Sequence, residues 1–317
     1  MKILVVLVIT VIITGLIACS APPQQINKPQ TPADSNRLRL HVEALTKTSQ
    51  PRNYLNADAL NEAAAYILKE FTSYGFKAEE QKYSVDGAEY KNVIASYGPA
   101  DAERIIIGAH YDVCGHQDGA DDNASGVAGL LELARLVSVL KPQLKYRVDF
   151  VAYTLEEPPF FRTENMGSAI HAKSLHAANV KIRAMICLEM IGYFSDEPNS
   201  QEYPVPGMKL MYPDKGNFIA VVGRTGQREI VQTISSLIKS GSDLPVETLN
   251  APESVPGIDY SDHQNYWKYD YEAVMITNTS FLRNPNYHQH SDTIETLDFK
   301  RMNEVVKGVY NAVVNLK

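Results

Sequence analysis

The segment RIIIGAHYD, residues 104–112, places three consecutive isoleucines shortly before a histidine and an aspartate. Apolar residues that do not alternate are typical of a central strand that is covered on both faces. Residues 124–140 follow with leucines and alanines on overlapping helical turns, and residues 147–153 have the character of another strand. This alternation of strand and helix predicts an α/β fold.

The remainder of the chain continues the pattern. Further strands are expected at residues 90–97, 182–190, 218–222 and 273–277. Further helices are expected at residues 57–71, 165–177, 227–239 and 299–316. We therefore expect a three-layer α/β/α sandwich with a mixed, largely parallel central sheet. Residues 193–216 show little pattern, and a connection of this length is predicted to be a functional loop over the active site.

The composition excludes several classes of protein. Of the 317 residues, 44% are hydrophobic and 21% are charged, so the chain can bury a sizeable core and is not intrinsically disordered. The 30 Lys and Arg against 37 Asp and Glu give a net charge of −7, and no basic run interrupts that balance, so no nucleic-acid partner is expected. Three cysteines are too few for a disulfide scaffold.

The N-terminus has the pattern of an export signal. Lys2 precedes an apolar run that ends in LIAC, residues 16–19, and this ending resembles the bacterial lipobox. The resemblance implies that residues 1–18 are a lipoprotein signal peptide and that Cys19 is lipidated. The chain would then be exported and anchored to a bacterial membrane, facing the periplasm or the cell exterior. A plain transmembrane anchor is the alternative, although the run is shorter than the roughly 20 residues of a spanning helix.

Residues 19–36 contain several prolines among polar residues and no apolar periodicity. They predict a flexible tether between the membrane and the folded part. Residues 37–317 are expected to form one domain, since no second domain is visible in the pattern.

Acidic side chains accompany the predicted strands. Asp122 lies in GADDNASG, directly before the helix that starts at residue 124. Glu156 and Glu157 follow one strand, and Glu189 lies near the end of another. The helix dipole or simple solvation usually explains such acids, but an acid after a buried strand is costly unless it is paired or metal-bound. One of the paired glutamates could bind a metal while its neighbour removes a proton from metal-bound water, since adjacent residues of an extended chain point in opposite directions.

Histidines complete this pattern. His110 and Asp112 are two apart and share a face of the strand, which suits a metal-binding imidazole oriented by a carboxylate. His288 lies in a loop shortly before the last helix. Each motif alone is common on protein surfaces. Together, three carboxylates and two imidazoles at the strand ends suit zinc, and one shared carboxylate would make a two-metal site with room for water.

Taken in order, these residues resemble metallopeptidase family 28, which contains bacterial di-zinc aminopeptidases and, as relatives, glutamate carboxypeptidase II and glutaminyl cyclase. The resemblance covers roughly residues 57–316. It rests on five motifs, His110-x-Asp112, Asp122-Asn123-x-Ser125-Gly126, Glu156-Glu157, Glu189 and His288-x-x-x-Asp292-Thr293. It implies the zinc-dependent exopeptidase fold and two Zn²⁺ ions per chain.

The resemblance also implies the ligands of both ions. Asp122 would bridge the two zinc ions. His110 and Glu189 would complete one site, and Glu157 and His288 would complete the other. Many family members carry aspartate where this chain has Glu189, and the longer side chain is expected to alter the pocket for the substrate amine.

The catalytic groups follow from the same resemblance. Glu156 matches the general base and acid, Asp112 the carboxylate that supports the histidine ligand, and Tyr287 a tyrosine that stabilises the oxyanion. Hydrolysis of a peptide substrate would proceed through a hydroxide between the two metals. We expect an aminopeptidase, because an acidic site beside metal ions suits a free α-amino group.

Several alternatives stay open. Arg162 or Arg283 could hold a C-terminal carboxylate, which would make the chain a carboxypeptidase. Glutaminyl cyclase chemistry on the same fold, typically with one zinc, and a non-catalytic surface binding protein are further alternatives. The sequence SDH at residues 261–263 suggests a serine hydrolase, but no Gly-x-Ser-x-Gly elbow is present. A monomer is the favoured oligomeric state.

Two cysteines lie beside the implied metal ligands. Cys114 comes just after Asp112, and Cys187 comes two residues before Glu189. Because both motifs converge on the implied metal site, the two sulfurs are candidates for a disulfide in an oxidising periplasm. Two free buried thiols are the alternative.

Overall fold

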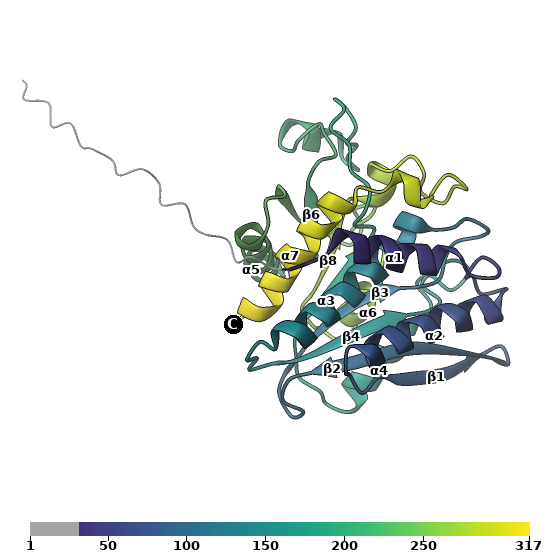
Figure 1. Ribbon diagram of the computed structural model, residues 1–317. Coiled ribbons are helices and arrows are strands. Elements are labelled where there is room, and N and C mark those ends of the chain that lie inside the picture. Colours follow the sequence, from purple (N-terminus) through teal and green to yellow (C-terminus); the bar gives the residue numbers. More distant parts are fainter. Residues whose placement is uncertain (1–31) are drawn as a thin grey trace, which may run out of the picture.

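The computed structural model describes residues 32–317, which build an eight-stranded sheet with helices on both faces (Figure 1). The strands are β1 (Glu79–Val85), β2 (Ala88–Tyr97), β3 (Arg104–His110), β4 (Arg147–Tyr153), β5 (Ile182–Glu189), β6 (Ile219–Arg224), β7 (Val246–Ala251) and β8 (Ala273–Thr277). Their order across the sheet is β1-β2-β4-β3-β5-β8-β6-β7. The pairs β4–β3, β3–β5, β5–β8 and β6–β7 are parallel, and the others are antiparallel. The predicted mixed, largely parallel sheet is confirmed.

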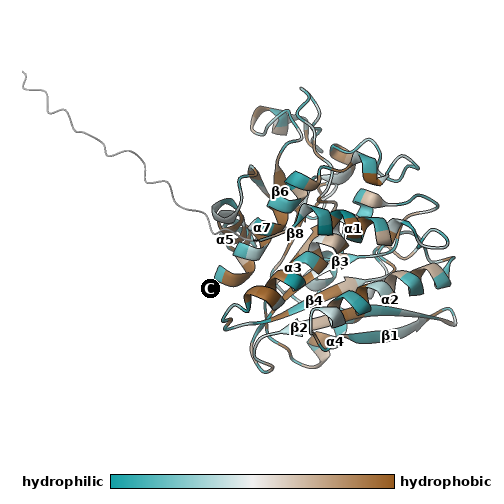
Figure 2. Ribbon diagram, viewed as in Figure 1, coloured by the Kyte–Doolittle hydropathy of each residue, from teal (hydrophilic) through white to brown (hydrophobic). Residues whose placement is uncertain are grey.

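Helices cover the two faces of the sheet unequally. The helices are α1 (Ser35–Thr46), α2 (Ala57–Ser73), α3 (Gly126–Leu140), α4 (Gly167–Ala177), α5 (Arg228–Gly241), α6 (Gln264–Trp267) and α7 (Phe299–Asn315). Buried residues of α1, α2, α3, α5 and α7 form the larger core on one face, and those of α4 and α6 form the smaller core on the other. In Figure 2, the outward sides of α1 and α2 are largely polar. The three-layer α/β/α sandwich is therefore confirmed.

The central strand β3 explains why its isoleucines do not alternate with polar residues. Ile105 and Ile107 pack into the larger core, whereas Ile106 packs into the smaller core on the opposite face. All three side chains are fully buried. Within residues 32–317, only the helical stretch Ala120–Leu140 is long and apolar enough to cross a membrane, and it is mostly buried as the core helix beside β3.

The folded part begins earlier than the predicted boundary at residue 37. The carboxylate of Asp34 caps the N-terminus of α1, and its backbone N–H donates to Oε1 of the buried Glu132 at 2.9 Å. The last residues of the predicted tether, 19–36, therefore already belong to the domain. Cys19 and the predicted signal peptide lie outside the described residues.

Four helices and strands of the structure are not among those expected from the sequence: strands β1 and β7, helix α1 and the four-residue helix α6. Strands β1 and β7 form the two edges of the sheet, and most of their side chains are polar and only partly buried, so alternation of apolar residues is weak. Helix α1 does carry a buried stripe at helical spacing, but it directly follows the polar, proline-containing segment.

Candidate metal centre and active site

The carboxyl ends of four neighbouring strands meet at one edge of the sheet, because β4, β3, β5 and β8 all run in the same direction. His110 ends β3, Glu189 ends β5, and Glu157 follows the end of β4. A helical turn before α3, η1 (Ala120–Ser125), carries Asp122, and the loop after β8 carries His288. All five predicted metal ligands therefore lie at this edge.

The two oxygens of Asp122 face two different imidazoles. Oδ1 lies 3.4 Å from Nε2 of His110, which is also 3.3 Å from Oε2 of Glu189. Oδ2 lies 3.1 Å from Nε2 of His288, which is also 3.3 Å from Oε2 of Glu157. The five residues thus form two groups of three donors that share one carboxylate.

This spacing of donor atoms fits zinc. In a tetrahedral site with zinc-to-donor distances of about 2.0–2.1 Å, neighbouring donors lie about 3.3 Å apart. Oε1 of Glu157 has no hydrogen-bond partner among the described residues, and Nε2 of His288 faces two carboxylate oxygens without the geometry of a hydrogen bond to either. Burial raises the pKa of Glu157 to about 7 and that of Glu156 well above its usual range, so ionised carboxylates here require positive charge. The donor set and its unpaired atoms suit divalent cations.

Two further predicted residues, Glu156 and Tyr287, line a cavity at the donors, and its volume of about 650 Å³ includes space that is open to solvent. Oε2 of Glu156 is 3.9 Å from Nε2 of His110, farther than the carboxylate oxygens of the ligand groups. The ring of Tyr287 stacks on that of His288, with centroids 3.8 Å apart, and burial raises the pKa of its phenol. Glu156 thus lies outside both ligand groups, and the phenol of Tyr287 keeps its proton and can donate a hydrogen bond.

Asp112 organises the site more broadly than its predicted contact with one histidine. Its carboxylate accepts hydrogen bonds from the backbone N–H groups of Glu156 at 3.2 Å and Glu157 at 3.0 Å. Nδ1 of His110 lies 3.2 Å from the carbonyl oxygen of Asp112 and 3.5 Å from its carboxylate. One aspartate therefore orients an imidazole and fixes the turn that presents both glutamates.

Comparison with known proteins places this site in a family. The sequence profile of peptidase family M28 matches residues 92–313, a stretch that contains all of the donors described above. The chain belongs to peptidase family M28. It is therefore a metallopeptidase of the zinc-exopeptidase type, which agrees with the donor geometry.

Two relatives illustrate the range of similarity in sequence. Uncharacterized protein YfbL of Escherichia coli (strain K12) is 48% identical over 299 residues, which cover 91% of each chain. Leucine aminopeptidase 1 of Ajellomyces dermatitidis is 23% identical over 274 residues, which cover 81% of this chain. This chain spans 65% of the length of that aminopeptidase.

Solved structures share the fold at low sequence identity. The LapA aminopeptidase of Legionella pneumophila superposes with a TM-score of 0.70 at 22% identity, covering 89% of this chain and 72% of that one. The glutaminyl cyclase of Bacteroides thetaiotaomicron superposes with a TM-score of 0.68 at 21% identity, covering 92% of this chain and all of that one. Structural similarity at this level of sequence identity supports the M28 fold. It does not identify the reaction, which has to be inferred from the residues of the site.

Several residues that hold the metal ligands in place are not indicated as site residues by the sequence. Asp292, which follows His288 in a predicted motif, accepts hydrogen bonds from the backbone N–H groups of Asp121 and Asp122. The carboxylate of Asp121 accepts from the side chains of Asn278 and Asn284, both at 2.8 Å. These bonds hold the η1 turn against the loop after β8.

Arg52 is a supporting residue that no local pattern indicates. It is almost completely buried, and its guanidinium donates to the backbone carbonyls of Leu45, Tyr111, Asp118 and Gly119. It thereby fixes the segment between β3 and η1, which carries ligands at both ends. Only the folded chain brings these carbonyls together.

The possible disulfide between Cys114 and Cys187 is not formed in the structure, where both cysteines are free thiols. Cys187 is buried inside β5, where its Sγ lies 3.1 Å from Oγ of Ser261. Cys114 instead lies beside Glu157 and His288 at the metal centre. The two sulfurs belong to different surroundings, although both segments approach the same site.

The arginines proposed for a C-terminal carboxylate are engaged elsewhere. Arg162 pairs with Asp259. Arg283 is buried over the ring of Phe218, at 4.4 Å from its centroid, and donates to Oε1 of Gln201.

The serine-hydrolase alternative also finds no support. Ser261 donates to Oε2 of Glu189 at 2.7 Å, whereas Nε2 of His263 donates to the carbonyl of Ile258 at 2.7 Å. The serine therefore holds a metal-ligand carboxylate and is not paired with the histidine.

Proposed function

We propose that this M28 peptidase is an aminopeptidase with two zinc ions that removes N-terminal residues with large apolar side chains. The observation that carries the proposal is an apolar cavity next to the metal-ligand cluster, together with the absence of lysine and arginine among the described residues that line either cavity. The apolar cavity favours an apolar side chain on the first residue of the substrate. The absence of basic residues favours the amino end of the peptide over its carboxyl end.

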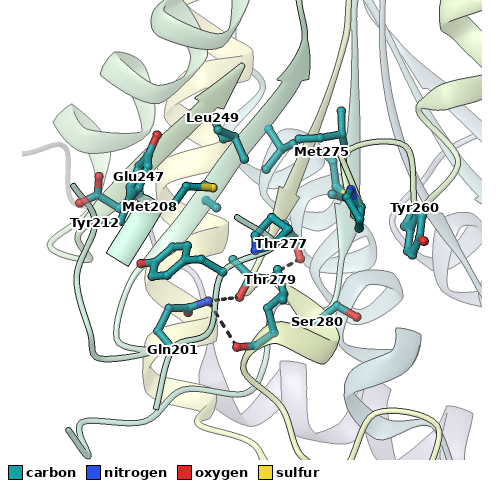
Figure 3. A pocket seen from close by; sticks show the side chains of 18 of the residues that line it. Gln201, Met208, Tyr212, Glu247, Leu249, Tyr260, Met275, Thr277, Thr279 and Ser280 are labelled. Carbon is teal, nitrogen blue, oxygen red and sulfur yellow. Dashed lines mark hydrogen bonds between the residues drawn. The ribbon is translucent and has the colours of Figure 1, made fainter. Parts of the chain in front are cut away.

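The apolar cavity lies between the sheet and the 193–216 loop, and its volume of about 670 Å³ includes space that is open to solvent. Thr277 of β8, Ala220 of β6 and Glu247 of β7 are successive strand partners in line with Glu189, and paired residues point to the same face of a sheet. This line of paired residues forms the floor of the cavity, and the 193–216 loop supplies Met208 and other residues of its wall. Figure 3 shows Thr277, Glu247 and Met208 among the side chains around the pocket.

The apolar cavity adjoins the cavity over the metal ligands. Glu189, Tyr260 and Ser280 line both spaces. A peptide with its first peptide bond at the metal centre can therefore place its first side chain in the apolar cavity. Burying a Leu, Met or Phe side chain there would contribute about 1.5–3 kcal/mol.

The charge of the site favours an amino terminus over a carboxyl terminus. Glu156, Glu157 and Glu189 line the cavity at the metal centre, so an α-ammonium group meets acidic side chains. A C-terminal carboxylate would meet the same acids without a basic partner, because neither Arg162 nor Arg283 lines this cavity. Arg162 instead pairs with Asp259, and Arg283 donates to Gln201.

The residues divide the chemical work as follows. When bound, zinc supplies Lewis acidity and lowers the pKa of water to near neutral. The carboxylate of Glu156 accepts the proton of the attacking water and returns it to the leaving amine. The phenol of Tyr287 donates a hydrogen bond to the oxygen that becomes negative. Asp112 keeps Glu156 in place through the backbone of the turn.

The activity is tested with peptide amides that begin with Leu, Phe, Ala or Gln, each with a free or an acetylated N-terminus. We expect cleavage of the free Leu and Phe substrates, loss of cleavage after acetylation, and loss after treatment with a chelator. Ala220→Leu, which fills the cavity floor, should reduce cleavage of Phe substrates more than that of Ala substrates. Equal cleavage of acetylated peptides, or cyclisation of N-terminal Gln without hydrolysis, would contradict the proposal.

We also propose that the chain is exported and anchored to a bacterial membrane through a lipid on Cys19. The support is the LIAC ending of the apolar N-terminal run. Fractionation of cells that express the full chain should find the protein with membranes, and labelled fatty acid should be incorporated into the wild type but not into Cys19→Ser. Incorporation into that variant at the level of the wild type, or none into the wild type, would reject lipidation of Cys19.

A further inference from the structure

We propose that Cys114 is a thiolate ligand of the metal ion that Glu157 and His288 hold. The proposal rests on the two-metal site proposed above and adds a donor to one half of it. The ion at this half would then have four protein donors, with Asp122 as the shared one. The ion at the other half would have three, from His110, Asp122 and Glu189.

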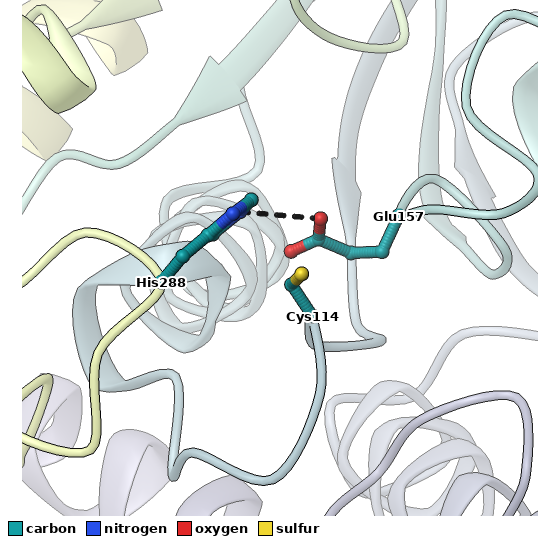
Figure 4. Close-up of side chains that lie close together, drawn as sticks. All are labelled: Cys114, Glu157 and His288. Atoms are coloured by element: carbon teal, nitrogen blue, oxygen red, sulfur yellow. Dashed lines mark ion pairs between the residues drawn. The ribbon is translucent and has the colours of Figure 1, made fainter.

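The three side chains lie close enough to bind one ion. A ligand atom from each of Cys114, Glu157 and His288 lies within 4.8 Å of the other two. Figure 4 shows the sulfur of Cys114 beside the carboxylate of Glu157, which faces the imidazole of His288. Zinc-to-sulfur distances of about 2.3 Å place a thiolate somewhat farther from its neighbouring donors than an oxygen. Binding of one ion would therefore draw the three donors together from their present separation of at most 4.8 Å.

The backbone around Cys114 is fixed on both sides. The N–H of the preceding Val113 donates to the carbonyl of Arg52 at 3.2 Å. The carbonyl of the following Gly115 accepts a hydrogen bond from Nδ2 of Asn53. Asp112 is tied to the turn that carries Glu157. The cysteine is thus held in the same framework as the metal ligands.

An unpaired carboxylate oxygen at this half of the site also supports a metal ion next to Cys114. The side chain of Glu157 is 94% buried. Its Oε1 nevertheless has no hydrogen-bond partner among the described residues, which is costly for a carboxylate unless a cation binds it. Cys187 differs from Cys114, because its sulfur contacts Ser261 and is not part of a group of possible metal ligands among the described residues. A thiolate is a soft, strongly donating ligand that zinc prefers over water.

A fourth protein donor makes the two ions unequal. A zinc ion with four protein ligands resembles a structural site, whereas one with three keeps a position for water or substrate. We therefore assign the exchangeable position to the half formed by His110 and Glu189, which also borders the apolar cavity. The half with Cys114 would hold its ion more firmly.

The test uses cobalt as a spectroscopic probe in the full chain. Protein loaded with two Co²⁺ ions should show a near-ultraviolet thiolate-to-cobalt charge-transfer band. Cys114→Ser should lose the band while its circular dichroism spectrum stays that of the wild type, and a chelator should remove one ion at least about tenfold faster. Cys187→Ser, the matched control, should keep both the band and the slow release.

Two results would overturn the assignment in distinguishable ways. Two bound cobalt ions without a charge-transfer band, or with a band that survives Cys114→Ser, would reject the thiolate ligand and leave the two-metal site intact. Fewer than two bound ions and no band would reject both the ligand and the two-metal site.

Discussion

Neighbouring residues of the same type take very different roles in this site. Asp121 and Asp122 are adjacent and both buried. Asp122 presents its oxygens to two imidazoles, whereas Asp121 accepts hydrogen bonds from the backbone of Gly192 and from two asparagines. The η1 turn separates the two side chains. The sequence predicts that acids cluster here, but the role of Asp121 emerges only when the loop after β8 packs against the turn.

Glu156 is the residue whose substitution most directly tests the mechanism. Glu156→Gln keeps the size and hydrogen-bonding shape of the side chain but cannot accept a proton. We expect kcat to fall by about 10²–10⁴-fold, while two zinc ions per chain remain bound. Steady-state kinetics together with metal analysis of the purified variant would check both parts.

Glu157→Gln is the matched control for that experiment, because it changes the adjacent ligand. It should lose metal as well as activity, since Oε2 of Glu157 lies 3.3 Å from Nε2 of His288. Near-normal turnover of Glu156→Gln would remove Glu156 from the role of base.

At the scale of secondary structure, the parallel direction of four strands creates the site. Their carboxyl ends place ligands that are far apart in the sequence at one edge of the sheet. Runs such as Ile105–Ile107 make these strands predictable, because burial on both faces leaves no polar alternation. Edge strands β1 and β7 are not predictable in this way, since their side chains are polar and half exposed.

The start of the domain depends on the cap of α1. Asp34→Ala removes the carboxylate that accepts a hydrogen bond from the N–H of Asn36 at 2.8 Å. We expect the free energy of unfolding to fall by about 1 kcal/mol. Urea denaturation of the wild type and the variant would measure this. Asn36→Ala, at an exposed position of the same turn, should change it by far less, and equal effects would contradict the cap.

The packing of α4 against β4 and α6 predicts a dependence of stability on pH. His171 of α4 is buried, its Nδ1 lies 2.6 Å from the hydroxyl of Tyr266, and burial lowers its pKa from 6.5 to about 4. The unfolded chain therefore binds a proton between pH 6.5 and 4 that the folded chain does not. This contribution to stability is complete above pH 6.5 and is lost as the pH falls toward 4.

His171→Gln should make unfolding less dependent on pH in this window, by up to about one proton, whatever its effect at pH 7. Urea denaturation at several pH values, with chelator present throughout, would measure the slope. His176→Gln, on the exposed side of the same helix, is the control and should keep the slope of the wild type. If the free energy of unfolding of His171→Gln depends on pH as strongly as that of the wild type, His171 is not the group responsible for this pH dependence.

Over the whole molecule, stability and metal binding are coupled. The metal centre gathers buried carboxylates, and burial raises the pKa of Glu157 to about 7. Bound cations offset this cost only in the folded state. At metal concentrations about 1,000 times the dissociation constant, the stabilisation is about 4 kcal/mol. A chelator should therefore lower the Tm markedly, and added Zn²⁺ should restore it in scanning calorimetry.

The same measurement distinguishes a binding effect from a general effect of the chelator. The variant Glu157→Gln should respond less than the wild type, because it has lost one donor of the second group. An identical Tm with and without chelator in the wild type would show that the acidic cluster folds without cations.

The sequence by itself determined the α/β architecture, the acidic and imidazole residues at the strand ends, and their resemblance to an M28 peptidase. These are local properties, since burial patterns and the chemistry of side chains are written in short segments. Only the tertiary structure decided which atoms face each other. It separated Cys114 from Cys187, recruited Arg52 and Asp292 as supports, and placed an apolar cavity beside Glu189. Such relations join residues that are distant along the chain, and no short-range pattern records them.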